Sequence, residues 1–198
     1  RMLHLMNPLR IDFVEAHALL QDARVLDVGC GGGLAAEAMV RRGAQVTGLD
    51  ASMQMLQAAR LHAEESGLQL QYEFGTAEEF TASHTGAFDL ITAFEMIEHV
   101  TDPEATVQAM SDMLAPGGVL ILSTLNRSPK AYLGAIVFAE YLAQWVPKGT
   151  HDYSRFRRPS ELAGYARNAG LQPAKIEGLT WHPLYRQFQR DPNDLSIN

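Results

Sequence analysis

Three groups of residues in this sequence have the types and spacing that chemistry requires. The first is Val25-Leu-Asp-Val-Gly-Cys-Gly-Gly-Gly33, an aliphatic run that ends in glycines and leads into a helical pattern. Glycine adopts positive φ easily and has no side chain, so Gly29 and Gly31 let the backbone turn sharply and lie close to a ligand. The helix start that follows offers free N–H groups. The pattern predicts a ligand-binding loop, and the alternative is a tight turn without a ligand.

The spacing of these glycines distinguishes two kinds of adenosine site. A dinucleotide-binding fingerprint places its third glycine where Leu34 stands. Glycines at 29, 31 and 33 are instead typical of S-adenosylmethionine sites. The second group centres on Asp50, which follows 21 residues after Gly29 at the end of a second predicted strand. A carboxylate at this position can bind both ribose hydroxyls. Asp50 could instead cap the next helix, but Ser52 can fill that role. The predicted cofactor is therefore S-adenosylmethionine.

Further cofactor contacts follow from the position of residues at strand ends, because ligands of open α/β sheets bind outside the carboxyl ends of the strands. The third predicted strand ends near Ala77, where backbone groups could bind an adenine edge. The fourth ends at Phe94, which could pack against the adenosine or sulfonium region or be a plain core aromatic. Asp27, inside the first strand, either faces the ligand's ammonium group or anchors the loop backbone.

The third group is Glu95, Glu98 and His99. If a helical turn begins after the fourth strand, positions i, i+3 and i+4 share one face. Two carboxylates and an imidazole there could hold Mg²⁺ or Mn²⁺. The alternative is an acidic helix start that complements the helix dipole, with His99 bonded locally. His99 could also act as a general base, and His151 is a second candidate for that role.

The elements that must position these residues alternate between strand and helix patterns. Short aliphatic runs predict strands over 24–28, 45–49, 70–74, 88–94, 119–124 and 174–179. Helical periodicity predicts helices over 33–42, 53–66 and 103–114. This alternation is typical of a three-layer, Rossmann-like, doubly wound and mostly parallel sheet.

One long segment interrupts this alternation after the fifth strand. Residues 126–159 are far longer than an ordinary connection, so we predict a single domain over 1–198 with an inserted lid over 126–159. Residues 131–146 form an apolar helical pattern, and basic residues follow at Lys148, Arg155, Arg157 and Arg158. Apolar surface beside positive charge favours a membrane surface. The alternative is that the helix packs on the core or on a second subunit.

Composition excludes several classes of protein. The chain has 46% hydrophobic and 20% charged residues, which is typical of a globular protein. Its formal net charge of −7 repels phosphate backbones, so we expect no nucleic-acid partner. A single cysteine, Cys30, allows no internal disulfide and favours a reducing compartment. No apolar run approaches the ~20 residues that span a bilayer, and the start does not resemble a signal peptide.

These motifs together resemble the ubiquinone-biosynthesis O-methyltransferases, over essentially the whole chain. The glycine loop, the Thr47-Gly-Leu-Asp50 segment and Pro116-Gly-Gly118 occur across class I methyltransferases. More particular segments are Asn7-Pro-Leu-Arg10, Glu95-Met-Ile-Glu-His99, Ser123-Thr-Leu-Asn126 and Val146-Pro-Lys-Gly-Thr-His151.

The resemblance implies O-methylation of phenolic hydroxyls on polyprenylated catechol and demethylubiquinol intermediates. It implies that S-adenosylmethionine is contacted by Arg10, Gly29, Asp50 and Phe94. It also favours a metal ion such as Mg²⁺ at Glu95, Glu98 and His99. The catalytic residues would be His99 and Glu98. It also implies a cytoplasmic enzyme at the inner membrane that touches the bilayer through 131–158, with other ubiquinone-pathway enzymes as further partners.

The reaction would be an in-line attack of a phenolate on the sulfonium methyl group. A free phenol ionises near pH 10, so either a metal must acidify the hydroxyl or His99 must remove its proton. A small-molecule C- or N-methyltransferase is the main alternative. A nucleotide-dependent oxidoreductase is disfavoured by Leu34, and a non-catalytic S-adenosylmethionine-binding regulator would need no lid.

The two ends of the chain carry a separate expectation. The sequence opens in a helical pattern, so we expect the natural start to lie upstream of Arg1. A fold of this kind should finish with an antiparallel strand pair, of which 174–179 is the first member. We expect the last strand to begin near 195–197 and the natural C-terminus to lie beyond it.

Overall fold

The computed structural model describes residues 2–124, 126, 156–182 and 187–194. The chain forms two compact units, one over residues 10–123 and the other over 1–9 with 124–198. The first unit holds the sheet, the glycine loop and the predicted site residues from Arg10 to His99.

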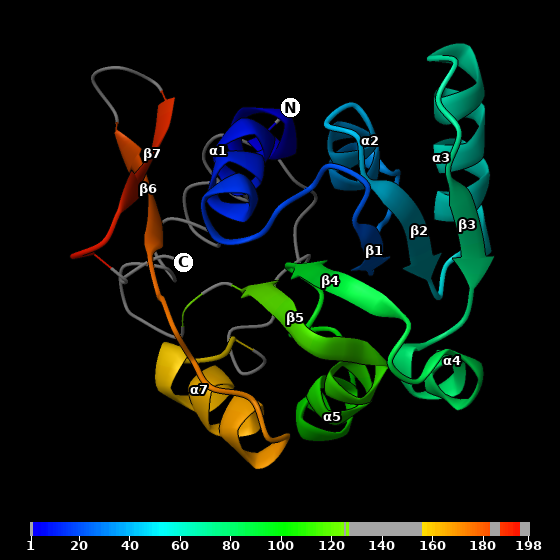
Figure 1. Ribbon diagram of the computed structural model, residues 1–198. Helices are drawn as coiled ribbons and strands as arrows, with labels where there is room; N and C mark the ends of the chain where they lie inside the picture. The colour runs from blue at the N-terminus through cyan, green and yellow to red at the C-terminus, as the bar shows by residue number, and fades with distance from the viewer. Residues whose placement is uncertain (1, 125, 127–155, 183–186, 195–198) are drawn as a thin grey trace. The chain divides into compact units, whose positions relative to one another are not determined.

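A five-stranded sheet forms the centre of the first unit (Figure 1). Its strands are β1 (Arg24–Val28), β2 (Gln45–Asp50), β3 (Gln71–Phe74), β4 (Phe88–Phe94) and β5 (Leu114–Ser123). The order is β3-β2-β1-β4-β5, and every neighbouring pair is parallel. The chain therefore winds outward from β1 in both directions. The predicted doubly wound sheet is confirmed, and the switch point lies between β1 and β4.

Helices cover both faces of this sheet. α1 (Met2–His17), α2 (Leu34–Val40) and α3 (Met53–Glu65) lie on one side in Figure 1, and α4 (Ala77–His84) and α5 (Pro103–Met113) lie on the other. Strands covered on both faces are apolar along their whole length, which explains the continuous aliphatic runs in the sequence. In β1, for example, every residue from Val25 to Val28 is buried.

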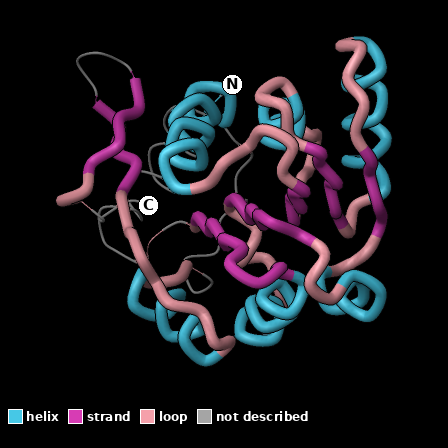
Figure 2. The backbone as a smooth tube through the Cα atoms, in the orientation of Figure 1, coloured by secondary structure: helices cyan, strands magenta, loops and turns pink. Residues whose placement is uncertain are grey.

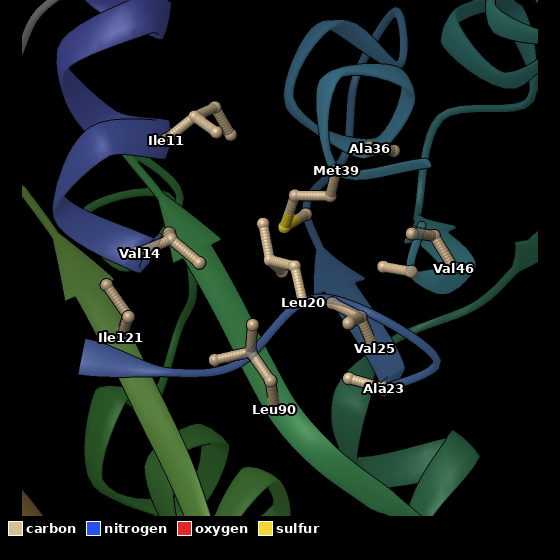
Figure 3. Close-up of a cluster of buried hydrophobic side chains, with 11 residues drawn as sticks. Ile11, Val14, Leu20, Ala23, Val25, Ala36, Met39, Val46, Leu90 and Ile121 are labelled. Carbon is tan, nitrogen blue, oxygen red and sulfur yellow. The ribbon is translucent and has the colours of Figure 1, made fainter. Parts of the chain in front are cut away.

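The core under α1 and α2 fixes the elements that carry the site. Val25 of β1 and Leu90 of β4 are register partners, and both point into a cluster that also contains Val14 of α1 and Met39 of α2 (Figure 3). All four side chains are almost fully buried. Ile11 belongs to the same cluster, so the α1 segment that carries Arg10 is held against the sheet.

Local capping explains where the helices begin after each strand. Ser52 accepts a hydrogen bond from the N–H of Met55 at the start of α3, as predicted. Thr76 and Glu79 form a reciprocal capping box at the start of α4. Asp102 caps α5, whose first residue is Pro103. Ser52 and Thr76 each begin a helix directly after a strand end, whereas Asp102 follows the longer connection after β4.

Two elements of the first unit differ from the sequence prediction. The sequence did not predict α4, because its eight residues contain few apolar side chains and its signal is the capping box. β5 begins at Leu114 and not at 119, because Leu114 pairs with Phe88 before a shift in register brings Val119 opposite Leu90. Pro116 and Gly117, residue types that are typical of turns, lie within this irregular stretch.

The second unit contains α7 (Pro159–Asn168) and an antiparallel pair, β6 (Gly178–His182) and β7 (Gln187–Asp191). The predicted terminal pair is confirmed, but its boundaries are wrong. β6 begins at 178 and not at 174, and the second strand is 187–191 (Figure 2). The polar composition of Gln187–Asp191 hid this strand, in which every residue is at least partly exposed. Residues 195–198 and 127–155 lie outside the described residues. The second range contains the predicted lid helix over 131–146 and His151.

Among the described residues, no helix combines the length and apolar character that crossing a bilayer requires.

An exposed ion pair joins the amino ends of β1 and β4. The Arg24 guanidinium donates to both oxygens of Asp89, at 3.0 and 2.7 Å, and the Arg24 backbone N–H donates at 2.9 Å. These hydrogen bonds, above all those from the side chain, lower the pKa of Asp89 from 3.8 to about 2.

A carboxylate with a lowered folded-state pKa stabilises the protein above its unfolded pKa, and this contribution is lost as pH falls through the folded value. We therefore predict that Asp89→Asn destabilises the protein most above about pH 4, and that the difference from wild type disappears towards pH 2. Urea unfolding across this pH range measures it, with the exposed Asp12→Asn as the matched control. A difference that grows as pH falls would contradict the prediction.

Candidate functional site

The glycine loop connects β1 to α2 at the carboxyl edge of the sheet. Gly29, Gly31 and Gly33 all have positive φ, at 70°, 53° and 80°. The N–H groups of Gly29 and Cys30 donate to the carbonyl of Leu49, at 2.7 and 3.1 Å. The loop is thus attached to the end of β2 by its own backbone, and the predicted sharp turn is confirmed.

Asp50 joins the loop to the start of α3. Its Oδ2 accepts a hydrogen bond from the Gly31 N–H at 2.8 Å, and its Oδ1 accepts one from the Ser52 N–H at 2.8 Å. A carboxylate offers about four lone-pair directions. Because Asp50 is only partly buried, both oxygens retain capacity for a ligand's hydroxyl groups. Asp50 therefore shapes the loop and also presents a partly exposed carboxylate beside it.

Asp27 lies beneath the loop and is only 2% exposed. Its Oδ1 accepts a hydrogen bond from the Thr92 hydroxyl of β4 at 2.7 Å. Its Oδ2 is buried and has no hydrogen-bond partner among the described residues. Burial raises the pKa of Asp27 to about 7, against the opposing effects of the Thr92 hydrogen bond and the Arg10 charge. A cationic ligand group near Oδ2 would offset the cost of burying this carboxylate.

Arg10 of α1 lies over the end of β4. Its Cζ is 5.4 Å from the centroid of the Phe94 ring, and its guanidinium forms an ion pair with Glu95. Arg10 is 6% exposed, and burial lowers its pKa to about 10 although Asp27 and Glu98 favour its charge. Its Nε has no hydrogen-bond partner among the described residues. Phe94 is partly buried, and it is more than a core aromatic because it contacts a buried cation.

Glu95 ends β4 in a conformation that few residues other than glycine adopt, with φ at 46°. Its backbone N–H donates to the Ser123 carbonyl at 3.0 Å, and the Ser123 hydroxyl donates to its Oε1 at 2.7 Å. The ion pair with Arg10 completes this arrangement. Glu95 therefore joins the ends of β4 and β5 to α1.

The predicted helical turn over Glu95, Glu98 and His99 is wrong. Residues 97–99 form a single turn closed by the His99 N–H and the Met96 carbonyl at 2.9 Å, and Glu95 lies in a bend before it. Glu98 is buried, whereas His99 is exposed. Among the described residues, no group of three acidic, histidine or cysteine side chains could hold a metal ion. Glu95 is engaged by Arg10 and Ser123, and the assignment of a metal ion to these three residues stays a prediction.

The end of β3 brings a further group of residues to Asp50. The Gly75 N–H donates to the Asp50 carbonyl at 3.1 Å, and Ala77 follows as the buried first residue of α4. Phe74, the register partner of Asp50, is 57% exposed. Met55 of α3 is also exposed, and its Cε lies beside Gly31 and Gly32. Phe74 and Met55 give this edge an apolar border that the sequence analysis missed, although an aromatic as the last residue of a strand was a usable signal.

Asp50→Ala tests the part of this site that geometry defines most closely. It removes the carboxylate that we predict to bind the ribose and the acceptor for the Gly31 N–H, so S-adenosylmethionine should bind about 1.5–3 kcal/mol more weakly. Titration calorimetry measures the affinity. Asp89→Ala, at the opposite edge of the sheet, is the control and should bind normally. Unchanged affinity in folded Asp50→Ala would refute the assignment.

Comparison with known proteins shows which families this chain is similar to. Residues 2–176 match the family model of a methyltransferase domain. A protein named ubiquinone biosynthesis O-methyltransferase from Azoarcus sp. (strain BH72) is 51% identical over 196 residues, which are 99% of this chain and 84% of that protein. One of the same name from Saccharophagus degradans is 47% identical, again over 99% of this chain and 83% of the relative.

Solved structures share the fold. A crystal structure described as a candidate sarcosine dimethylglycine methyltransferase from Galdieria sulphuraria has a TM-score of 0.69 and 19% identity, over 87% of this chain and 63% of that chain. An S-adenosylmethionine-dependent methyltransferase from Mesorhizobium loti has a TM-score of 0.51 and 28% identity, over 59% of this chain and 53% of that chain. This chain thus spans less than two thirds of either structure, and the likeness concerns the fold.

Proposed function

This chain belongs to the ubiquinone biosynthesis O-methyltransferases, and on that premise we propose that it methylates the phenolic hydroxyls of polyprenylated catechol and demethylubiquinol intermediates. S-adenosylmethionine is the methyl donor. The observation that supports the proposal best is the hydrogen bond between Asp50 and the glycine loop, because it places a partly exposed carboxylate next to a loop made for close approach.

The residues of the carboxyl edge suit S-adenosylmethionine, which supplies an electrophilic methyl group on a sulfonium. We assign Asp50 to the ribose hydroxyls and the backbone near Ala77 to the adenine edge. Gly29 and Gly31 would let the backbone lie against the ligand. The unpartnered Oδ2 of Asp27 suits the ammonium group, and its burial explains why a cation is needed there.

Arg10 and Phe94 occupy the neighbouring position at the end of β4. We propose that Arg10 attracts the carboxylate of the methionine end, since its Nε is buried without a partner among the described residues. Phe94, whose ring already lies against a cation, suits the positively charged sulfonium region. Glu95 would hold Arg10 in place for this role.

In the proposed reaction a phenolate oxygen attacks the methyl group in line with the bond that breaks. A carbon–oxygen bond forms, the carbon–sulfur bond breaks, and its electron pair stays on sulfur. The phenol's proton goes to a ring nitrogen of His99, which is exposed on the turn after β4 and able to accept it. Holding the two reactants in line supplies much of the remaining acceleration. We assign Glu98 no proton, because it is buried and its charge acts on Arg10.

Magnesium at Glu95, Glu98 and His99 is the alternative way to activate the phenol. The arrangement of these residues does not favour it, since Glu95 is already bonded to Arg10 and Ser123. We therefore assign no step to a metal ion and keep His99 as the base.

A direct assay separates these mechanisms. With a polyprenyl catechol, His99→Gln should lower kcat by roughly 10²–10⁴-fold, while chelator-treated wild type should keep full turnover. Mass spectrometry of the product shows whether oxygen, carbon or nitrogen carries the methyl group, which separates this function from a C- or N-methyltransferase. Turnover that vanishes with chelator and returns with Mg²⁺ would refute His99 as the sole activating group.

We also propose that the enzyme works on the cytoplasmic side of the inner membrane, where a prenylated substrate resides. The support is the sequence of 131–158, with its apolar pattern and its basic residues. Most of this segment lies outside the described residues. Other enzymes of ubiquinone synthesis are expected partners, because successive intermediates stay in the bilayer.

Liposome flotation tests the membrane contact. The protein should float with anionic vesicles and less with neutral ones, because each basic residue near the headgroups contributes on the order of 1 kcal/mol. Trp145→Ser combined with Arg157→Glu should weaken flotation, and Arg24→Glu, which adds the same charge change elsewhere, should have a smaller effect. Absence of flotation with anionic vesicles would remove the membrane proposal.

A further inference from the structure

We infer that Tyr72 is a positioning residue for the cofactor, because its ring supports the glycine loop from below. Tyr72 is the second residue of β3 and the register partner of Gly48 in β2. It is 7% exposed and packs in a small core cluster with Cys30 of the loop and with Leu56 and Ala59 of α3. The inference rests on the proposed binding of S-adenosylmethionine at this loop.

Gly48 shows how closely the ring lies against β2. A Cβ added at Gly48 would be 2.7 Å from Cδ1 and 2.8 Å from Cε1 of Tyr72, and 2.9 Å from Sγ of Cys30. The φ of Gly48 is not positive, so its backbone could accept other residues. Glycine is therefore needed at this position of the Thr47-Gly-Leu-Asp50 segment because the Tyr72 ring and the Cys30 thiol occupy the space.

Gly33 shows that the same side chain reaches the end of the loop. A Cβ added there would collide with the Tyr72 hydroxyl oxygen and would lie 3.1 Å from Cζ. Gly33 is also the N-cap of α2. One side chain thus contacts β2 at Gly48, the middle of the loop at Cys30 and its last glycine at Gly33. The height of the loop above the sheet depends on the thickness of this ring.

The hydroxyl group of Tyr72 lies against Gly33 but adds no hydrogen bond to this support. It is buried and has no hydrogen-bond partner among the described residues. Burial also raises the pKa of Tyr72, so the group stays neutral. An unpartnered buried hydroxyl is unfavourable. The ring, and not the hydroxyl, is the part that the loop needs, and Tyr72→Phe becomes the natural conservative variant.

Removing the ring should affect the cofactor and spare the phenol. Cores do not collapse fully around a lost side chain, so Tyr72→Leu leaves space below the loop. The loop can then move, and with it the Gly31 N–H that holds the Asp50 carboxylate. Neither His99 nor the other residues of the turn over 97–99 belong to this cluster, and the turn meets the loop only where Met96 lies beside Gly29, among the residues that the structure describes. Binding of S-adenosylmethionine should weaken, whereas kcat at saturating cofactor should change little.

The experiment compares Tyr72→Leu, Tyr72→Phe and a control, Val107→Ala, which is fully buried in α5 on the other face of the sheet. S-adenosylhomocysteine affinity is measured by calorimetry, together with the KM values for both substrates, kcat and Tm. For Tyr72→Leu we expect the Kd and the cofactor KM to rise about tenfold, with the phenol KM and kcat within about twofold. Tyr72→Phe should match wild type, and Val107→Ala should lower Tm without a change in cofactor affinity.

A second variant covers the case in which Tyr72→Leu does not fold. Gly48→Ala pushes the ring from the other side and should also raise the cofactor Kd. Its effect on the Kd should be smaller in a protein that already carries Tyr72→Leu, because the shorter side chain makes room for the added methyl group. The inference is overturned if Tyr72→Leu and Gly48→Ala weaken cofactor binding no more than Val107→Ala. It is also overturned if Tyr72→Phe is as damaging as Tyr72→Leu. Calorimetry reads these outcomes even if the protein methylates no phenol, so the two proposals fail separately.

Discussion

The hydrogen bond from the Gly31 N–H to the Asp50 carboxylate is the interaction on which the cofactor site depends. It links the loop after β1 to the end of β2, and the second oxygen of Asp50 holds Ser52 at the start of α3. In the function that we propose, the same carboxylate also binds the ribose. One side chain therefore sets the distance between the loop and the ligand, and the glycines at 29, 31 and 33 supply the backbone freedom that this distance requires. Tyr72 supports the loop from the opposite side.

A second arrangement holds the other half of the site. Arg10 is buried in an acidic environment of Asp27, Glu95 and Glu98, and its ion pair with Glu95 connects α1 to the ends of β4 and β5. Removing one partner of a buried ion pair leaves an uncompensated charge, which is more damaging than losing an exposed pair such as Arg24 and Asp89. These partners hold Glu95 in its positive-φ conformation. The chain changes direction there, and His99 lies on the following turn, outside the group of buried side chains around Arg10.

The sequence predicted the sheet, its parallel winding and the sharp turn at the loop glycines, because each depends on local pattern. It also predicted correctly that Ser52, and not Asp50, caps α3. The sequence did not predict the features whose structure depends on long-range contacts. The spacing of Glu95, Glu98 and His99 is the same in a helix and in a turn, and only the contact with Arg10 shows which one forms. The need for glycine at 48 depends on Tyr72 in the neighbouring strand, which no local pattern reveals.

A crystal structure of the complex with S-adenosylhomocysteine tests the account most directly. It should show both ribose hydroxyls donating to Asp50, at 2.5–3.0 Å as expected for charged acceptors, while the Gly31 N–H keeps its hydrogen bond to the same carboxylate. The ammonium group should lie beside Oδ2 of Asp27. A complex in which Asp50 turns away from Gly31 to reach the ribose, or in which the adenosine binds elsewhere, would contradict the central claim that one carboxylate shapes the loop and binds the cofactor.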